Sequence, residues 1–470
     1  MIFNSLLFPV LLAAALLVRW SSLPWLGRRQ GLLALSYAFY ACWIPGHLLL
    51  LLGLTVFVQA IVVLMGAASS LPARRWLLAA GIAGSLCPLL FYKYALFFSE
   101  LVVRVLGFGN IVPHSALGSL LLPVGISFYT FEAISYLVDV YRAEGRGRAS
   151  LLDFALFLAF FPRMVAGPIM RATSFFPQCL QPSPFSAEAL VSGARLLVLG
   201  LFEKIVLADW AFAPTADRIF KVDLQHDWMS TWTGVVAFAF QIFFDFAGYS
   251  TAAVGVARML GFSLPPNFNS PYAATSLSDF WKRWHISLSS WLRDYLYIPL
   301  GGNRGGRWRT HFNLTTTMLI GGLWHGAALR FIAWGGLHGL LLVGQRELTP
   351  KEPSSLAIPF RPLAAALTVF VAVCFTWVFF RATSLGHSLA LCRTMLGAGP
   401  GADSLPGLTL IATWTLAVAC LTCHWLTRDL SIDAIWERWR PTNRALACAA
   451  MVLLMLLSPD DNRTFIYFHF

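Results

Sequence analysis

The run from residue 48 to residue 66 reads LLLLLGLTVFVQAIVVLMG and contains no charged side chain. A helix rises about 1.5 Å per residue, so roughly 20 apolar residues cross the hydrocarbon core of a bilayer. A strand of a membrane β-barrel would instead alternate apolar and polar residues, and this run does not. The run therefore predicts a membrane-spanning helix.

Similar runs recur along the whole chain of 470 residues, of which 58% are hydrophobic and 12% charged. Soluble domains carry about 25% charged residues, so most of this chain must lie in lipid. We predict an all-α, polytopic helix bundle with about 11 to 13 transmembrane or re-entrant helices and interfacial amphipathic helices. The expected spans are 2–18, 31–44, 48–66, 76–98, 118–140, 151–169, 189–208, 232–260, 312–329, 331–345, 363–380, 408–426 and 445–457.

The positive charge points to topology rather than to nucleic acid. The formal net charge is +12, which by itself could indicate nucleic acid or anionic lipid as a partner. Arginine pairs at 28–29 and 74–75 follow predicted spans, and the positive-inside rule places both pairs in the cytoplasm and the N-terminus outside. The first segment lacks a basic leader, so we expect a retained span rather than a signal peptide.

One cysteine motif resembles a haem attachment site and is rejected. Residues 420–424 read CLTCH, which matches the C-x-x-C-H signature of c-type haem. The motif lies inside a predicted span, where a haem could not be attached. The other cysteines lie mostly in apolar stretches, so we expect no disulfide framework. We also expect no metal site and no permanently bound cofactor.

Residues 279–296 predict an amphipathic helix in the membrane interface. Asp279 and Arg283 stand four residues apart, which favours a local ion pair over direct contact with substrate. The apolar face would hold Phe280, Trp281, Trp284, Leu288, Trp291, Leu292 and Tyr295, and the polar face Lys282, His285, Ser289 and Arg293.

A loop with four glycines and three arginines follows at residues 298–309. Glycine amides and guanidinium groups can converge on a phosphate, so Arg304 and Arg307 are candidates for holding a nucleotide-like thioester. The spacing matches neither a P-loop nor a dinucleotide fingerprint. The alternative, favoured by the charge bias, is a cytoplasmic loop that sets topology.

His325 lies in an apolar stretch that begins at Phe312, within the sequence GGLWHGA. A helix from residue 312 would place this imidazole roughly 20 Å along the span. Burying its charge is costly, so the ring must be neutral and hydrogen-bonded, or face a water-filled cavity. His325 is therefore a functional candidate, with a structural hydrogen-bonding role as the alternative. The glycines at 321, 322 and 326 would let another backbone or a bound chain approach closely.

The segment 157–339 resembles the membrane-bound O-acyltransferases, and within them the bacterial branch that acylates alginate and teichoic acids. The chain departs from that branch at Thr251, where an acid is expected, and at Arg163, where another polar residue is common. The resemblance rests on ordered blocks: FFP at 160–162 with AGPI at 166–169, FDFAGYS at 244–250, NFNSPY at 267–272, SDFWKRWHISLS at 278–289, WLRDY at 291–295, GLWHGA at 322–327 and the tail FIYFHF at 465–470.

The resemblance implies roles for two histidines. His325 would be the active-site histidine and His285 the second functional histidine. Other residues are weaker candidates for substrate binding or tunnel lining. For two of them, Trp324 and Trp284, packing in the core is the alternative. Those weaker candidates are Trp324, Trp284, Asp279, Arg283, Arg293, Asp245, Tyr249, Asn269, Arg304 and Arg307. The expected division of the chain is scaffold helices at 1–110, a catalytic core at 111–345 and C-terminal helices at 346–470.

The expected reaction is acyl transfer to an alcohol. A neutral His325 would take the proton of an acceptor hydroxyl, and the oxygen would attack a thioester carbonyl. The resemblance implies an acyl thioester on the cytosolic side, with acetyl-CoA expected. The acceptor would be an exported cell-surface polysaccharide, or a periplasmic or extracellular protein that relays the group. We expect a multi-pass protein of the bacterial inner membrane whose partners also include membrane lipid but no nucleic acid.

Two other classes compete with this interpretation. A transporter or flippase would need paired intramembrane acids or an ion-coupling site, and few acids lie in the predicted spans. A scaffold of an exopolysaccharide secretion complex would need neither His325 nor His285. The sequence leaves alginate, cellulose, another exopolysaccharide and peptidoglycan open as acceptors.

Overall fold

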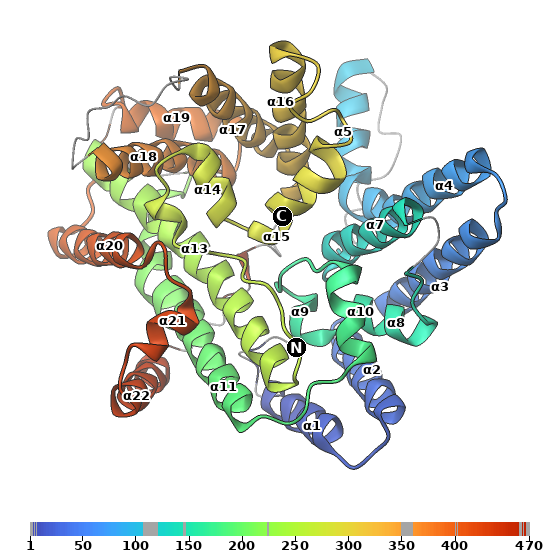
Figure 1. Ribbon diagram of the computed structural model, residues 1–470. Coiled ribbons are helices and arrows are strands. Elements are labelled where there is room, and N and C mark those ends of the chain that lie inside the picture. The colour runs from blue at the N-terminus through green and yellow to red at the C-terminus, as the bar shows by residue number, and fades with distance from the viewer. Residues whose placement is uncertain are drawn as a thin grey trace. The chain divides into compact units, whose positions relative to one another are not determined.

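The computed structural model is built from α-helices, which confirms the fold class expected from the sequence (Figure 1). It describes residues 1–470 except 1, 2, 4, 6, 107–120, 144–146, 223, 224, 349–360, 400, 402, 460–462, 464 and 467–470. Among the described residues there is no β-strand, and an isolated bridge joins His226 and Asp403. The start of the predicted span 118–140 lies outside the described residues.

Within the described part of the chain, five helices are long and apolar enough to cross a membrane by length and composition. They are Pro45–Ala67, Leu71–Ser99, Trp228–Met259, Pro362–Arg381 and Gly407–Thr427, with Phe8–Trp20 and Pro441–Leu457 as shorter apolar helices. Each overlaps a span predicted from the sequence. The other predicted spans form shorter or more polar helices.

The predicted span 151–169 is not one continuous helix. The chain forms α8 (Leu151–Ala159), leaves the helical conformation at Phe160 with ψ 101°, and turns once more in α9 (Phe161–Met164). Proline has no amide hydrogen and restricts the residue before it, so Pro162 and Pro168 prevent one continuous helix. The apolar composition indicated burial correctly, but not the path of the chain.

The chain divides into two compact units, of which the first comprises Met1–Leu197 with Ser250–Pro265. In this unit α3 packs against α2, α4, α7 and α8. Its helices are α1 (Phe8–Trp20), α2 (Trp25–Ala41), α3 (Pro45–Ala67), α4 (Leu71–Leu89), the π-helix η1 (Leu90–Tyr94), α5 (Ala95–Leu106), α7 (Ile126–Arg142), α8, α9 and α10 (Ala172–Leu180). Helices α11 (Ala187–Phe202) and α13 (Trp228–Met259) contribute residues to both units.

Buried arginines tie the loops of the first unit to its helices. Arg19 is 1% exposed and its Nε donates to the carbonyl of Leu260 at 2.8 Å. Arg163, one of the departures from the family pattern, pairs with the buried Glu132. A charge removed from water needs such a partner, so these side chains are structural.

The second unit comprises Val198–Tyr249 with Pro266–Phe470. Its helices are η2 (Glu203–Phe212), α12 (Ala213–Ile219), the first part of α13, η3 (Pro271–Ala273), α14 (Leu277–Arg283), α15 (Ile286–Leu292), η4 (Arg293–Tyr297), α16 (Arg307–His325), α17 (Leu329–Leu348), α18 (Arg361–Arg381), α19 (Leu385–Met395), α20 (Gly407–Thr427), α21 (Ile432–Glu437) and α22 (Pro441–Leu457).

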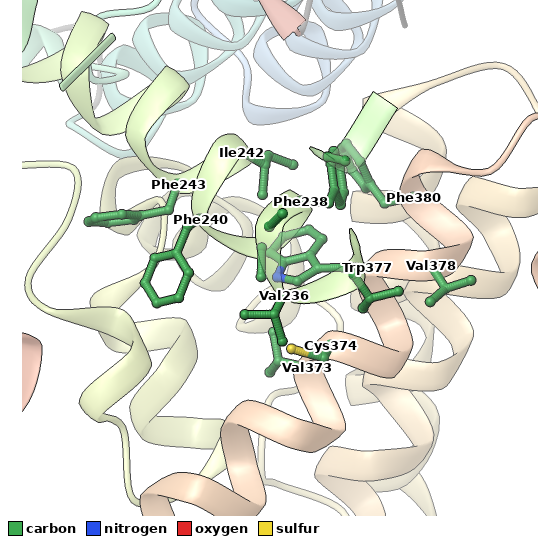
Figure 2. Packing of buried hydrophobic residues seen from close by; sticks show 14 of the residues in the cluster. Val236, Phe238, Phe240, Ile242, Phe243, Val373, Cys374, Trp377, Val378 and Phe380 are labelled. Carbon is green, nitrogen blue, oxygen red and sulfur yellow. The ribbon is translucent and has the colours of Figure 1, made fainter. Parts of the chain in front are cut away.

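An aromatic core holds the second unit together (Figure 2). Side chains of α13, such as Phe240 and Phe243, and side chains of α18, such as Cys374 and Trp377, belong to one buried cluster. Lipid is as apolar as these side chains, so close van der Waals packing rather than exclusion from water favours their association. We refer to this cluster as the aromatic core.

Glycines bring α16 and α17 into close contact, and the two helices lie side by side (Figure 1). A Cβ added to Gly335 would collide with the carbonyl oxygen of Met318, and one added to Gly322 with that of Phe331. The expectation that Gly322 admits another backbone is therefore confirmed. This contact fixes the position of the end of α16, where His325 lies.

Gly335→Ala should destabilise the protein. The added methyl group forces α16 and α17 apart, and overpacking of this kind costs about 1–3 kcal/mol. The measurement is thermal unfolding in detergent, followed by size-exclusion chromatography after heating. Gly344→Ala on the same helix is the matched control, because nothing lies within 4 Å of its added Cβ. Equal melting temperatures for the two variants would contradict the proposed contact.

Candidate active site

The segment predicted as one amphipathic helix is broken at its centre. Helix α14 ends at Arg283, α15 begins at Ile286, and between them His285 has a φ of 43°. Non-glycine residues rarely adopt this left-handed conformation, which costs of order 1–3 kcal/mol. The prediction of a continuous interfacial helix with His285 on its polar face is therefore wrong. His285 is fully buried.

The side chain of Asn267 holds the break in place. Its Oδ1 accepts hydrogen bonds from the Ser287 amide at 3.2 Å and the Ser287 hydroxyl at 2.8 Å. The Nδ1 of His285 lies 3.2 Å from the same oxygen. Because an amide oxygen only accepts, Nδ1 carries the proton and Nε2 carries the lone pair. Asn267 thus sets both the orientation and the tautomer of His285.

The surroundings of His285 keep its ring neutral. Phe246 meets the imidazole edge-on with ring centroids 4.6 Å apart, and Trp324 lies 6.1 Å away. Burial lowers the pKa of His285 from its ordinary value near 6.5 to about 3. The imidazole therefore keeps its Nε2 lone pair at physiological pH.

His325 is the last residue of α16 and is 3% exposed. Three aromatic rings surround it, with centroid distances of 5.0 Å to Trp324, 5.0 Å to Trp334 and 5.3 Å to Phe380. The chain turns extended at Gly326, where an added Cβ would collide with the ring of Phe331. This glycine allows the helix to end directly after His325.

The two histidines meet at one tryptophan. Trp324 is 5% exposed and packs edge-on against the rings of both His285 and His325. Residues separated by 40 positions in the sequence thus share one buried aromatic environment. We refer to His285, Trp324 and His325 as the histidine site.

Trp284 belongs to the aromatic core. It is 1% exposed and packs on Trp377 at 4.9 Å and on Phe280 at 5.6 Å. These contacts fit the alternative that Trp284 has a packing role. Trp324, in contrast, lies at the histidine site.

Asp279 and Arg283 form the local ion pair expected from their spacing. Arg283 Nε lies 2.8 Å from Asp279 Oδ1, and its Nη1 donates to the carbonyls of Arg428 at 2.5 Å and Asn269 at 3.3 Å. Asn269 itself is exposed and its amide donates to the carbonyl of Arg283. These residues join α14 to the loop that follows α20.

The arginine candidates on the glycine-rich loop are engaged with neighbouring groups. Arg307 pairs with Glu347, and Arg293 pairs with the adjacent Asp294 at 2.8 Å. The amide of Arg304 donates to the carbonyl of Gly301 in a turn. All four loop glycines have positive φ, at 116°, 56°, 88° and 90° for residues 301, 302, 305 and 306. The glycines are therefore needed for the turn itself.

Asp245 and Tyr249 lie one helical turn apart on α13, behind Phe246. Asp245 is 2% exposed and pairs with Lys204, and the ammonium of Lys204 lies 5.5 Å from the ring centroid of Tyr249. Asp245 accepts a hydrogen bond from the amide of Ile466, and the ring of Tyr249 packs against Phe465. Both candidates therefore contact residues near the C-terminus.

Sequence reasoning selected Asn269 and missed Asn267. Both lie in the block NFNSPY, but Asn267 is 2% exposed and hydrogen-bonded to the histidine site. Ser287 was missed for the same reason. Residues two positions apart lie on the same side of a regular extended segment, so the local pattern does not distinguish Asn267 from Asn269. The burial of Asn267 follows from its contact partners, His285 and Ser287.

The haem-like motif lies within α20, as expected. Cys420 is buried, Cys423 is exposed, and His424 stacks on Tyr272 with centroids 5.7 Å apart. The motif therefore has an ordinary packing role in a helix.

Comparison with known proteins identifies the class. Residues 142–385 match the membrane-bound O-acyltransferase family. The chain is 41% identical to the probable alginate O-acetylase AlgI of Pseudomonas aeruginosa over 78% of this chain and 69% of that protein. It is 35% identical to the peptidoglycan O-acetyltransferase of Helicobacter pylori (77% and 72%) and 26% identical to the teichoic acid D-alanyltransferase of Bacillus subtilis (58% and 72%).

This chain belongs to the membrane-bound O-acyltransferase family. It is an acyltransferase and a multi-pass membrane protein, as the resemblance implied. The histidine site lies within the matched residues. The roles assigned to individual residues remain predictions.

Asn267→Ala should lower the rate of acyl transfer by about tenfold or more, because His285 loses the acceptor that sets its tautomer. Asn267→Asp should move the acidic limb of the pH–rate profile to higher pH. A carboxylate beside Nδ1 raises the pKa of His285, so the ring is protonated and loses its lone pair at a higher pH than in the natural protein. Both are measured with purified protein in proteoliposomes.

Asn443→Ala is the control for these variants, since Asn443 is exposed on α22. It should retain the natural rate and pH profile. If Asn267→Ala matched this control, Asn267 would have no part in positioning His285.

Proposed function

We propose that the protein transfers an acetyl group from a cytosolic acetyl thioester, acetyl-CoA, to a hydroxyl of an exported cell-surface polysaccharide. The observation that carries the proposal is the histidine site, in which two buried imidazoles pack against one tryptophan in a member of a family of O-acyltransferases. The relatives named as alginate and peptidoglycan O-acetylases support acetyl as the group and a polysaccharide as the acceptor.

His325 acts as the general base in this proposal. The imidazole takes the proton of the acceptor hydroxyl, and the oxygen attacks the carbonyl carbon of the thioester. A C–O bond forms, the C–S bond breaks, and the departing thiolate takes the proton from the imidazolium. Base catalysis of this kind contributes about 10² to 10⁴ in rate, and positioning supplies the rest.

The end of α16 supports this role. His325 lies in the last turn of a helix of 19 residues, where the helix macrodipole presents partial negative charge. That charge stabilises the imidazolium that forms when the proton is accepted. The rings of Trp334 and Phe380 exclude water from the same place, which strengthens the interaction.

His285 serves the donor in this proposal. Its Nε2 lone pair, set by the bond of Nδ1 to Asn267, can accept a hydrogen bond from the pantetheine arm or assist the proton transfer. The donor enters from the cytosol and the acceptor from the other side of the bacterial inner membrane. A periplasmic or extracellular protein that receives the acetyl group and passes it to the polymer would fit the same chemistry.

His325→Ala should abolish acetyl transfer while the protein stays folded in the membrane, and His285→Ala should impair transfer severely. The measurement combines ester content of the extracellular polysaccharide in cells with transfer of labelled acetyl from acetyl-CoA in proteoliposomes. His387→Ala on α19 is the matched control and should keep the natural rate.

A natural ester content in cells carrying His325→Ala would remove His325 from the mechanism. Failure of the unmodified protein to use acetyl-CoA, with transfer from another thioester, would overturn the proposed donor and leave the histidine roles intact. The acceptor is identified by supplying alginate, cellulose and peptidoglycan fragments separately and locating the new ester.

A further inference from the structure

Arg463, Phe465 and Ile466 are held in the second unit by specific contacts. We refer to these three residues as the C-terminal segment. Phe465 is 1% exposed and Ile466 is 8% exposed, and Ile466 belongs to the aromatic core. Two apolar side chains outside the long helices are therefore packed into the interior of the unit.

Asp245 provides the first anchor. The backbone amide of Ile466 donates to Asp245 Oδ2 at 2.7 Å, while Asp245 Oδ1 pairs with Lys204. Lys204 in turn lies 2.9 Å from Asp209 Oδ1, and all three ionic side chains are at least nine-tenths buried. A hydrogen bond from an amide to a buried carboxylate is charge-assisted and stronger than one between neutral groups. The carboxylate itself is compensated by the ammonium group.

Asp217 on α12 provides the second anchor. Arg463 pairs with Asp217 Oδ2, and Arg381 at the end of α18 lies 2.8 Å from Asp217 Oδ1. One carboxylate thus receives two guanidinium groups. The two anchors hold the segment at both of its ends, three residues apart.

Phe465 lies between these anchors in the sequence and connects to the histidine site through ring contacts. Its ring packs against Tyr249 at 4.9 Å and against Phe246 at 5.8 Å. Phe246 is the residue that meets His285 edge-on at 4.6 Å. The contacts therefore run from the C-terminal segment through one phenylalanine of α13 to the second histidine.

We infer that the C-terminal segment is a positioning element of the active site, which presses Phe246 against His285 and is itself fixed by Asp245 and Asp217. The inference rests on the role proposed for His285. Asp245 and Phe465 are positioning residues in this arrangement, because they act through Phe246 and do not touch the reacting atoms. This role gives a reason for the burial of the Asp245 carboxylate and the Lys204 ammonium group.

Phe465→Ala tests the contact with Phe246. Removing the ring leaves the amide of Ile466 free to keep its bond to Asp245, but lets Phe246 and His285 move. We expect kcat for acetyl transfer to fall by about tenfold, with KM for acetyl-CoA within about twofold, since displacements near 1 Å can cost 10²-fold. Phe465→Leu, which refills most of the space, should recover at least about half of the natural kcat.

A double-mutant cycle separates positioning from loss of stability. In a Phe246→Leu background, Phe465→Ala should lower kcat by less than about twofold, because the ring through which it acts has been removed. Phe212→Ala removes an equally buried ring that stacks on Phe240 and Phe244, and it should lower stability without lowering kcat. A natural kcat in Phe465→Ala, or full additivity with Phe246→Leu, would overturn the inference.

The anchor is tested without any measurement of activity. Hydrogen exchange of the Ile466 amide, followed by mass spectrometry of the C-terminal peptide, should become at least about tenfold faster in Asp245→Ala. Asp245→Asn keeps an acceptor oxygen and should exchange more slowly than Asp245→Ala. Asp429→Ala, which removes a carboxylate that is 76% exposed, should leave the exchange unchanged.

The transfer assay and the hydrogen-exchange measurement distinguish failure of the proposed function from failure of the inferred anchor. If the natural protein transfers no acetyl group but Asp245→Ala accelerates exchange, the proposed function fails and the anchor stands. If transfer is normal and exchange in Asp245→Ala equals that of the natural protein, the anchor is wrong and the inference is overturned.

Discussion

One amide oxygen, Asn267 Oδ1, determines the conformation of the break between α14 and α15, on which the position of His285 depends. It accepts from the amide and hydroxyl of Ser287 and from Nδ1 of His285. In a dry interior each backbone donor must be paired, so these bonds offset the cost of the left-handed conformation at His285. They hold the imidazole beside Asn267 at the break between α14 and α15. The position of the second histidine therefore depends on a residue 18 positions earlier in the chain.

The first histidine depends on a different constraint, which is the close approach of α16 and α17. Gly322 and Gly335 allow the two backbones to touch, and Gly326 allows α16 to end at His325. Trp334, one residue before Gly335, then meets the imidazole at 5.0 Å. Small residues are used where helices must approach closely in lipid, because packing rather than exclusion from water is what favours their contact. The glycines thus set the distance between the end of α16 and Trp334 on α17.

The proposed acyl transfer depends on a base in a water-poor environment. Both imidazoles are packed against aromatic rings, whereas several buried charged groups of this unit are paired with one another. Lys204, Asp209 and Asp245 form one such set, and Asp217 with Arg381 and Arg463 forms another. This separation lets ionic contacts hold the chain in place while the reacting atoms stay among apolar side chains. The C-terminal segment joins the two regions.

The sequence alone determined the class of fold, because long apolar runs require helices wherever backbone groups cannot bond to water. It also identified His325 and His285 as candidates. An ionisable side chain in an apolar run is costly and therefore points to a function, and ordered sequence blocks resembled one family. Only the tertiary structure decided which polar groups meet. The break at His285, the choice of Asn267 over Asn269, and the placement of Asp245 against the C-terminal segment depend on partners far away in sequence. Local patterns carry periodicity and composition but not such pairings, since these form only when distant segments pack together.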